Sequence, residues 1–368
     1  MSAPLPRPHL RQIAAYDPGH DLTQLRARHG GLLCELGANE NPLGPSPSAL
    51  AAFERAAASV HRYPDPSGRA LKAALAARHR HPEQGIVLGN GSHELLVLLA
   101  RCFAGPGDQV LFSRFGFAVF PIAAALAGAE GMAAPAFPEE HPRAFGHDPQ
   151  ALADALSSRV RLLFIANPNN PTGSWLSLAE IEALLAHADP QTLVVVDEAY
   201  QEYVLEEEPR SAVALLSRFP QLVVTRTFSK AYGLAALRVG YLLAHPEVAC
   251  WLERCRETFN VNQPAQEAAL AALGDEAHLR VVREANARER ERLAAGLSAL
   301  GLEVHPSRAN FLLVRFGEQA AAIGEALLAR GIVLRPLMPY GLDAHLRVSV
   351  GRAEENERLL SALAELLR

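Results

Sequence analysis

The chain has 368 residues, of which 49% are hydrophobic and 20% charged, a composition typical of a protein that folds around an apolar core. Its length exceeds the usual size of one domain, so we expect one large and one smaller domain. The formal net charge is −5, with 35 Lys and Arg against 40 Asp and Glu, which argues against general binding to nucleic acid.

Cysteine usage and the N-terminus bear on the cellular compartment. The four cysteines are Cys34, Cys102, Cys250 and Cys255. They lack the paired spacing of a metal site, so we expect free thiols in a reducing compartment. The N-terminus has prolines at positions 4, 6 and 8 and lacks the apolar core of a secretion signal. No apolar run is long enough to span a bilayer. We therefore expect a cytoplasmic protein without a metal ion or a membrane partner.

The first third of the chain begins with a proline-rich arm, predicted over residues 1–35 with a turn at 16–19. Helices are predicted at 48–60 and 69–80 and a strand at 85–88, which runs into the turn Gly89-Asn90-Gly91-Ser92-His93-Glu94 and a helix at 95–103. A glycine turn that opens a helix can bind an anion through its N–H groups and the helix dipole. It equally fits a plain connection with Ser92 as N-cap, so both interpretations stay open.

The middle of the chain alternates between strand and helix patterns. Strands are predicted at 109–112, 160–166, 191–196 and 221–225, and helices at 118–128, 149–157 and 178–188. Runs such as 193–196 are apolar on both faces, as in central strands covered by helices. This pattern predicts an α/β domain over 36–262 with a mostly parallel, doubly wound sheet. Ligands of such sheets bind at the carboxyl ends of the strands.

The pattern changes near residue 263. A helical stretch at 265–300 breaks near Gly274, and strands at 311–314, 332–335 and 346–350 alternate with helices at 320–330 and 354–367. We interpret residues 263–368 as a small α+β domain.

A lysine flanked by hydroxyl groups follows the strand at 221–225. If partly desolvated, Lys230 would have a lowered pKa and could form a Schiff base with an aldehyde. Ser229 and Arg238 could hold a phosphate beside it. The alternative is a surface lysine in an ordinary loop.

Three further polar residues follow predicted strands, namely Asn170, Asp197 and Tyr200. A carboxylate can keep a ring nitrogen protonated, while a phenol and an amide can bind a ring oxygen. Taken singly, Asp197 could be a helix N-cap, Asn170 a turn residue and Tyr200 a core residue. Together with the lysine they predict a site for an aldehyde cofactor that carries a ring and a phosphate.

These motifs carry a family resemblance. Residues 167–173 (Asn-Pro-Asn-Asn-Pro-Thr-Gly), 196–200 (Val-Asp-Glu-Ala-Tyr) and 229–241 resemble the fold-type I aminotransferases, which use pyridoxal 5′-phosphate. More narrowly, residues 38–47, 61–64, 89–94, 259–262, 309–312 and 346–351 resemble histidinol-phosphate aminotransferases. The resemblance runs from about residue 16 to the C-terminus. It implies a mostly parallel, seven-stranded sheet with helices on both faces, plus the small domain.

The resemblance also implies roles for single residues. Lys230 would be the Schiff-base lysine and proton shuttle, Asp197 the partner of the pyridinium nitrogen, and Tyr200 and Asn170 the partners of the ring hydroxyl. The phosphate would bind at Ser92, His93, Ser229 and Arg238, and Phe117 would stack on the ring.

Other roles concern the partner subunit and the substrates. Tyr63 would reach the phosphate of a partner subunit, which implies a homodimer with shared active sites. Arg347 would clamp the substrate's α-carboxylate, and Tyr16 and Arg335 would lie near its distal end.

The resemblance leaves the amino donor open, because some residues depart from the family's pattern. These are His93, Thr258, Phe259 and the pair Met338-Pro339. The preferred interpretation is transfer from histidinol phosphate to 2-oxoglutarate in histidine biosynthesis. The alternatives are an aromatic amino-acid aminotransferase and a decarboxylase of a phosphorylated amino acid. A regulatory binding module would need a DNA-binding domain, for which we expect no room before the arm.

Overall fold

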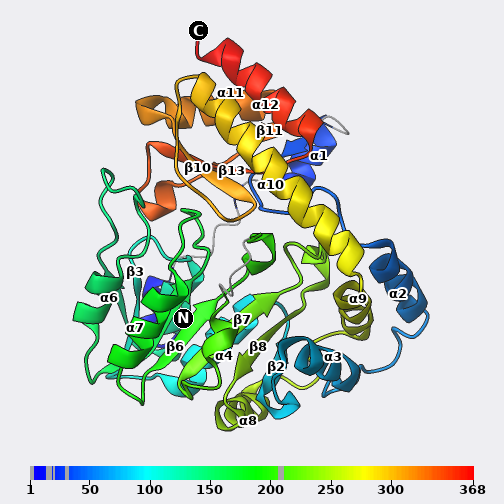
Figure 1. Ribbon diagram of the computed structural model, residues 1–368, viewed down its shortest axis with the longest axis vertical. Helices are drawn as coiled ribbons and strands as arrows, with labels where there is room; N and C mark the ends of the chain where they lie inside the picture. The colour runs from blue at the N-terminus through cyan, green and yellow to red at the C-terminus, as the bar shows by residue number, and fades with distance from the viewer. Residues whose placement is uncertain (1–3, 14–18, 20, 30–32, 206–210) are drawn as a thin grey trace.

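The computed structural model describes residues 4–13, 19, 21–29, 33–205 and 211–368. Its lower part in Figure 1 is built on a seven-stranded sheet with the order β2-β8-β7-β6-β5-β3-β4. The strands are β2 (Ile86–Gly89), β3 (Gln109–Ser113), β4 (Glu130–Ala134), β5 (Val160–Ala166), β6 (Leu193–Asp197), β7 (Leu222–Thr227) and β8 (Gly240–Ala244). Strands β4, β3, β5, β6 and β7 pair in parallel, whereas β8 is antiparallel to both of its neighbours. The predicted mostly parallel sheet is confirmed.

Helices cover both faces of this sheet, as the sequence predicts. The two sets are α4 (Ser92–Phe103), α5 (Val119–Ala127) and α8 (Pro246–Cys255) on one face, and α6 (Pro149–Ala155) and α7 (Leu178–His187) on the other. A third cluster joins β2 and β8 to α2 (Pro47–Ala57), α3 (Arg69–His79) and α9 (Gln263–Gly274). The apolar runs of the central strands are thus buried between helices.

The upper part in Figure 1 is an α+β unit at the C-terminal end. Its four-stranded sheet has the order β12-β13-β10-β9, formed by β9 (Glu303–Val304), β10 (Phe311–Arg315), β12 (Arg335–Pro336) and β13 (His345–Ser349). Its helices are α10 (Glu276–Ala299), α11 (Ala320–Ala329) and α12 (Ala353–Leu366). The predicted helix break is confirmed, because Asp275 caps α10 by accepting from the N–H of His278.

The N-terminal segment touches both units. It contains the 3-10 helix η1 (Pro8–Gln12), which packs on α5, and α1 (Leu22–His29). Strand β1 (Cys34–Glu35) pairs in parallel with β11 (Ile332–Val333), and Leu36 is buried in the core of the upper unit. Residues 16–18 of the predicted turn lie outside the described residues.

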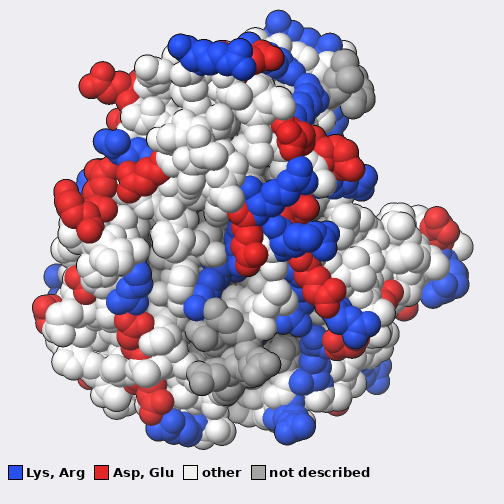
Figure 2. All heavy atoms as spheres, turned by 45° about the horizontal axis from the view of Figure 1, so that its top comes forward, with Lys and Arg blue, Asp and Glu red and all other residues white. Residues whose placement is uncertain are grey.

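On the face drawn in Figure 2, acidic and basic side chains lie interspersed. None of the helices in the described ranges is long and apolar enough to cross a membrane.

Candidate active site

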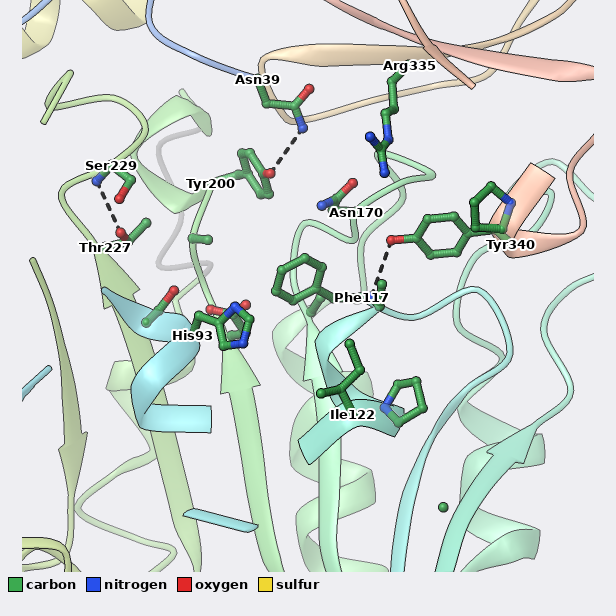
Figure 3. A pocket seen from close by; sticks show the side chains of 18 of the residues that line it. Asn39, His93, Phe117, Ile122, Asn170, Tyr200, Thr227, Ser229, Arg335 and Tyr340 are labelled. Carbon is green, nitrogen blue, oxygen red and sulfur yellow. Dashed lines mark hydrogen bonds between the residues drawn. The ribbon is translucent and has the colours of Figure 1, made fainter. Parts of the chain in front are cut away.

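A cleft of about 1170 Å³ opens at the carboxyl ends of β5, β6 and β7, beneath β13 and the 3-10 helix η8 (Met338–Tyr340). It brings together most of the residues singled out in the sequence, namely Ser92, His93, Phe117, Asn170, Asp197, Tyr200, Ser229, Lys230, Arg238, Arg335 and Arg347. Figure 3 shows some of these side chains, with His93, Phe117, Asn170, Tyr200 and Ser229 in the large unit below and Arg335 reaching down from the small unit above. Parallel strands explain the convergence, because their carboxyl ends meet at one edge.

Lys230 lies in the turn after β7. Its Nζ donates to the backbone oxygen of Ala38 at 3.3 Å and lies 5.7 Å from the ring centre of Tyr200. Burial and, to a lesser extent, the positive charge of Arg347 lower the pKa of Lys230 to about 8. About a tenth of this amine is therefore neutral and nucleophilic at pH 7, far more than for an ordinary lysine. The interpretation as an ordinary surface lysine is wrong.

Asp197 is the last residue of β6 and is only 4% exposed, so it is not a helix N-cap. Burial raises the pKa of Asp197 to about 6. The Thr225 hydroxyl donates to its Oδ1 at 2.8 Å and acts in the opposite direction, stabilising the carboxylate. At pH 7 the group is mostly ionised and faces the floor of the cleft.

An anion cup forms where α4 begins. Gly91 is the N-cap, with a φ of 84°, and no side chain caps the helix, so Ser92 is the first helical residue and not the N-cap. A Cβ at position 91 would collide with the Arg238 guanidinium, so the guanidinium can lie this close to the backbone because residue 91 is a glycine. Arg238 also donates to Ser229 Oγ at 3.1 Å. The N–H groups of α4, a hydroxyl and a guanidinium thus surround a space suited to a phosphate.

His93 lies beside this cup. Burial and the neighbouring Arg238 lower the pKa of His93, so its imidazole is neutral at pH 7. A neutral imidazole can donate one hydrogen bond without adding a charge.

Two arginines extend into the cleft from the small unit. Arg347 on β13 is 7% exposed, and its Nη1 and Nη2 donate to Asn170 Oδ1 and to the backbone oxygen of Gly37. The Asn170 Oδ1 therefore faces Arg347, and its amide NH₂ faces the opposite way. Arg335 at the start of β12 is half-buried and lies against Gly19 of the N-terminal segment.

Sequence reasoning missed several residues of the cleft. Asn39 donates from Nδ2 to Tyr200 Oη at 3.1 Å, and the Tyr340 hydroxyl accepts from the Ala118 N–H at 3.3 Å (Figure 3). The arm adds His9 and Ile13 to the wall. Asn39 belongs to the run 38–47, which contributed to the family resemblance, but a sequence motif does not reveal side-chain contacts.

Some predicted residues lie elsewhere. Tyr63 is 82% exposed and stacks on Phe259 at 4.6 Å between ring centres, outside the cleft. Tyr16 lies outside the described residues. Met338 is 72% exposed and does not line the cleft, although Pro339 does. Of the departures Phe259, Met338 and Pro339, only Pro339 therefore contributes to this cleft in the single chain.

Comparisons with known proteins agree with this geometry. Residues 33–363 match the family model of aminotransferase class I and II. A Thiobacillus denitrificans protein named histidinol-phosphate aminotransferase 1 is 48% identical over 364 residues, which cover 98% of this chain and 93% of that protein. Histidinol-phosphate aminotransferase 2 of Pseudomonas aeruginosa is 44% identical and covers 99% of this chain and 98% of its own length. A crystal structure of histidinol-phosphate aminotransferase from Sinorhizobium meliloti, in complex with pyridoxal 5′-phosphate, superposes with a TM-score of 0.87 at 32% identity, covering 98% and 97% of the two chains.

Proposed function

The chain belongs to the class I and II aminotransferases, and we propose on this premise that it transfers the amino group of histidinol phosphate to 2-oxoglutarate in histidine biosynthesis. Enzymes of this family use pyridoxal 5′-phosphate. The observation that carries the choice of donor is the 48% identity to a histidinol-phosphate aminotransferase over nearly the whole chain. The two arginines in one cleft support it, because donor and acceptor both carry anionic groups.

The cleft fits this cofactor group by group. The phosphate would bind in the cup formed by the start of α4, Ser229 and Arg238, where Gly91 leaves room for the guanidinium. Phe117 would lie against the ring face, and Asp197 beneath the ring nitrogen. When bound, pyridoxal phosphate supplies an electron sink for negative charge that develops at the donor Cα.

The chain's own residues would then bind, orient and move protons. Lys230 would hold the cofactor through the neutral form of its amine, and the same Nζ would accept the proton of the donor Cα. The carboxylate of Asp197, which accepts a hydrogen bond from the Thr225 hydroxyl, would keep the ring nitrogen protonated. Tyr200 and the NH₂ of Asn170, whose Oδ1 accepts from Arg347, would donate to the ring oxygen.

Two unlike substrates must use the same arginines in turn. Histidinol phosphate has no α-carboxylate, so its phosphate would bind Arg347. The acceptor 2-oxoglutarate would place its α-carboxylate on Arg347 and its second carboxylate on Arg335. The donor's imidazole would point towards the side of the cleft where His9, Ile13 and Tyr340 lie.

An aromatic amino-acid donor is a second candidate. Ile13, Ile122 and Pro339 give that side of the cleft an apolar wall that would also accept a phenyl ring.

We propose a cytoplasmic homodimer divided into an arm (1–35), a large domain (36–262) and a small domain (263–368). The exposed stacked pair Tyr63 and Phe259 is available to a partner's active site. The four cysteines are free thiols, which suits a reducing compartment.

An activity panel tests the proposed reaction. Purified holoenzyme is supplied with histidinol phosphate, phenylalanine or a phosphorylated amino acid, and glutamate formation and carbon dioxide release are followed together. We expect glutamate from histidinol phosphate at the highest kcat/KM and no carbon dioxide. Release of carbon dioxide without glutamate would instead establish the decarboxylase.

A further inference from the structure

Asn39 bridges the two units inside the cleft, between Tyr200 and Ser349 of β13. Its backbone N–H donates to Ser349 Oγ at 2.9 Å, and Ser349 Oγ donates back to Asn39 Oδ1 at 3.0 Å. Its Nδ2 donates to Tyr200 Oη at 3.1 Å. Asn39, Ser349 and Tyr200 are 1%, 3% and 5% exposed, so these groups are largely shielded from bulk water.

The serine decides which way the Asn39 amide faces. A hydroxyl has one hydrogen, and Ser349 Oγ already accepts from the Asn39 backbone, so its hydrogen goes to Oδ1. A flipped amide would take away that acceptor. Within the part of the chain that the structure describes, Ser349 Oγ has no other hydrogen-bond partner, so the flip would bury a hydroxyl hydrogen without an acceptor. The amide NH₂ is thus fixed towards Tyr200.

This orientation determines what the phenol can do. Because Oη accepts from Asn39, the hydrogen of Tyr200 points to a different acceptor. With a flipped amide, Tyr200 would instead donate to Asn39 Oδ1 and have no hydrogen for a ligand. The backbone of Asn39, whose φ of 56° suits asparagine, is held in addition by Asn310 Nδ2 at 3.1 Å from its oxygen.

We propose that Ser349 and Asn39 are positioning residues, which orient the Tyr200 hydroxyl so that it donates its hydrogen to the ring oxygen of the bound cofactor. This inference rests on the role of Tyr200 in the proposed function. Arg347 lies two residues before Ser349, on the same face of β13, and holds Asn170 Oδ1. Both donors to the ring oxygen are therefore oriented from one face of a strand in the small unit.

The test follows the visible absorption band of the lysine-bound cofactor as a function of pH in the holoenzyme, together with the cofactor dissociation constant. A donor to the ring oxygen stabilises its deprotonated form, so losing that donor raises the midpoint of the titration. We expect Tyr200→Phe to raise the midpoint by about one unit and to weaken cofactor binding roughly tenfold. Ser349→Ala frees the amide to flip, and Asn39→Asp replaces the amide donor with an acceptor while tolerating the same backbone conformation. Each should raise the midpoint nearly as far.

Double variants and controls separate orientation from general structural damage. In the Tyr200→Phe background, Ser349→Ala and Asn39→Asp should add no further shift, because they act through the phenol. Ser349→Thr retains the hydroxyl and should restore the wild-type midpoint. Ser113→Ala removes another buried hydroxyl, at the end of β3, and should leave the midpoint unchanged.

The outcomes distinguish this inference from the proposed function. An unchanged midpoint in Tyr200→Phe would refute the role of Tyr200 itself. A shift in Tyr200→Phe without one in Ser349→Ala and Asn39→Asp would refute the positioning relay and leave the proposed function standing. Shifts that add to that of Tyr200→Phe would refute the relay as well.

Discussion

Removing each arginine of the cleft should have different consequences for the two half-reactions. Arg347 is buried, and Asn170 and the Gly37 carbonyl already hold its guanidinium, so little ordering is needed when an anion binds. Truncating one partner of a buried, hydrogen-bonded charge pair costs about 2–5 kcal/mol. We therefore expect Arg347→Ala to lower kcat/KM by roughly 30- to 4000-fold for histidinol phosphate and for 2-oxoglutarate alike.

Arg335 is half-buried, so solvent screens its charge. An ion pair between Arg335 and a substrate carboxylate should therefore contribute about 1 kcal/mol to binding, so we expect Arg335→Ala to lower kcat/KM by roughly fivefold. The loss should fall on 2-oxoglutarate, whose second carboxylate we assign to Arg335, and should spare the donor.

Single-turnover kinetics of the two half-reactions separate these effects. Because Arg347 also lowers the pKa of Lys230, each variant is measured at its own pH optimum. Arg315→Ala serves as the control, since Arg315 pairs with Glu139 on the surface and lies outside the cleft. Arg347→Ala with nearly normal rates in both halves would refute the assignment, as would Arg335→Ala if it slowed the donor half more than the 2-oxoglutarate half.

Three further predictions concern Lys230, Asp197 and the assembly. Treatment of the holoenzyme with borohydride should abolish the visible band and leave the reduced cofactor attached to Lys230. The Lys230→Ala variant should lose about 10²–10⁴-fold in kcat. The rate of cofactor uptake by the apoenzyme should rise with pH through about 8, because the amine of Lys230 loses its proton in this range. Normal turnover by Lys230→Ala would contradict its role. Thr225→Val should raise the pKa of Asp197 above about 6, so the acid limb of kcat/KM moves up by about one pH unit; an unmoved limb would show that this carboxylate does not control it. Sedimentation should show a dimer, and Tyr63→Phe should weaken cofactor binding in it; a fully active monomer at assay concentrations would exclude shared sites.

The position of the site could be predicted because parallel strands leave few choices. Asn170, Asp197 and Lys230 follow β5, β6 and β7, which are neighbours in the sheet. Strands joined by right-handed crossovers are parallel, so neighbouring strands end at the same edge of the sheet and bring their carboxyl ends together. The chemistry of the floor of the cleft therefore followed from local sequence patterns alone.

Other features depended on contacts between distant segments. Strands β4 and β8 were not predicted from the sequence. Strand β4 is a largely exposed edge strand that contains Gly and Ala and no β-branched or aromatic residue, so its strand propensity is low. Strand β8 follows directly after the turn at Arg238, and no separate strand pattern was assigned to it. The predicted strand 332–335 divides into β11 and β12, which pair with β1 and β13 in two different sheets. Asn39 meets its partners across 161 and 310 residues of chain, and no local pattern reports such contacts.

The identity of the amino donor is the central claim, and single-turnover spectra of the holoenzyme test it most directly. Histidinol phosphate, phenylalanine and histidine are mixed separately with the enzyme, and conversion of the cofactor to its amine form is followed by loss of the visible band. We predict that histidinol phosphate converts the cofactor fastest, because its phosphate reaches Arg347, and that added 2-oxoglutarate restores the band. Faster conversion by phenylalanine would contradict the account and establish an aromatic amino-acid aminotransferase.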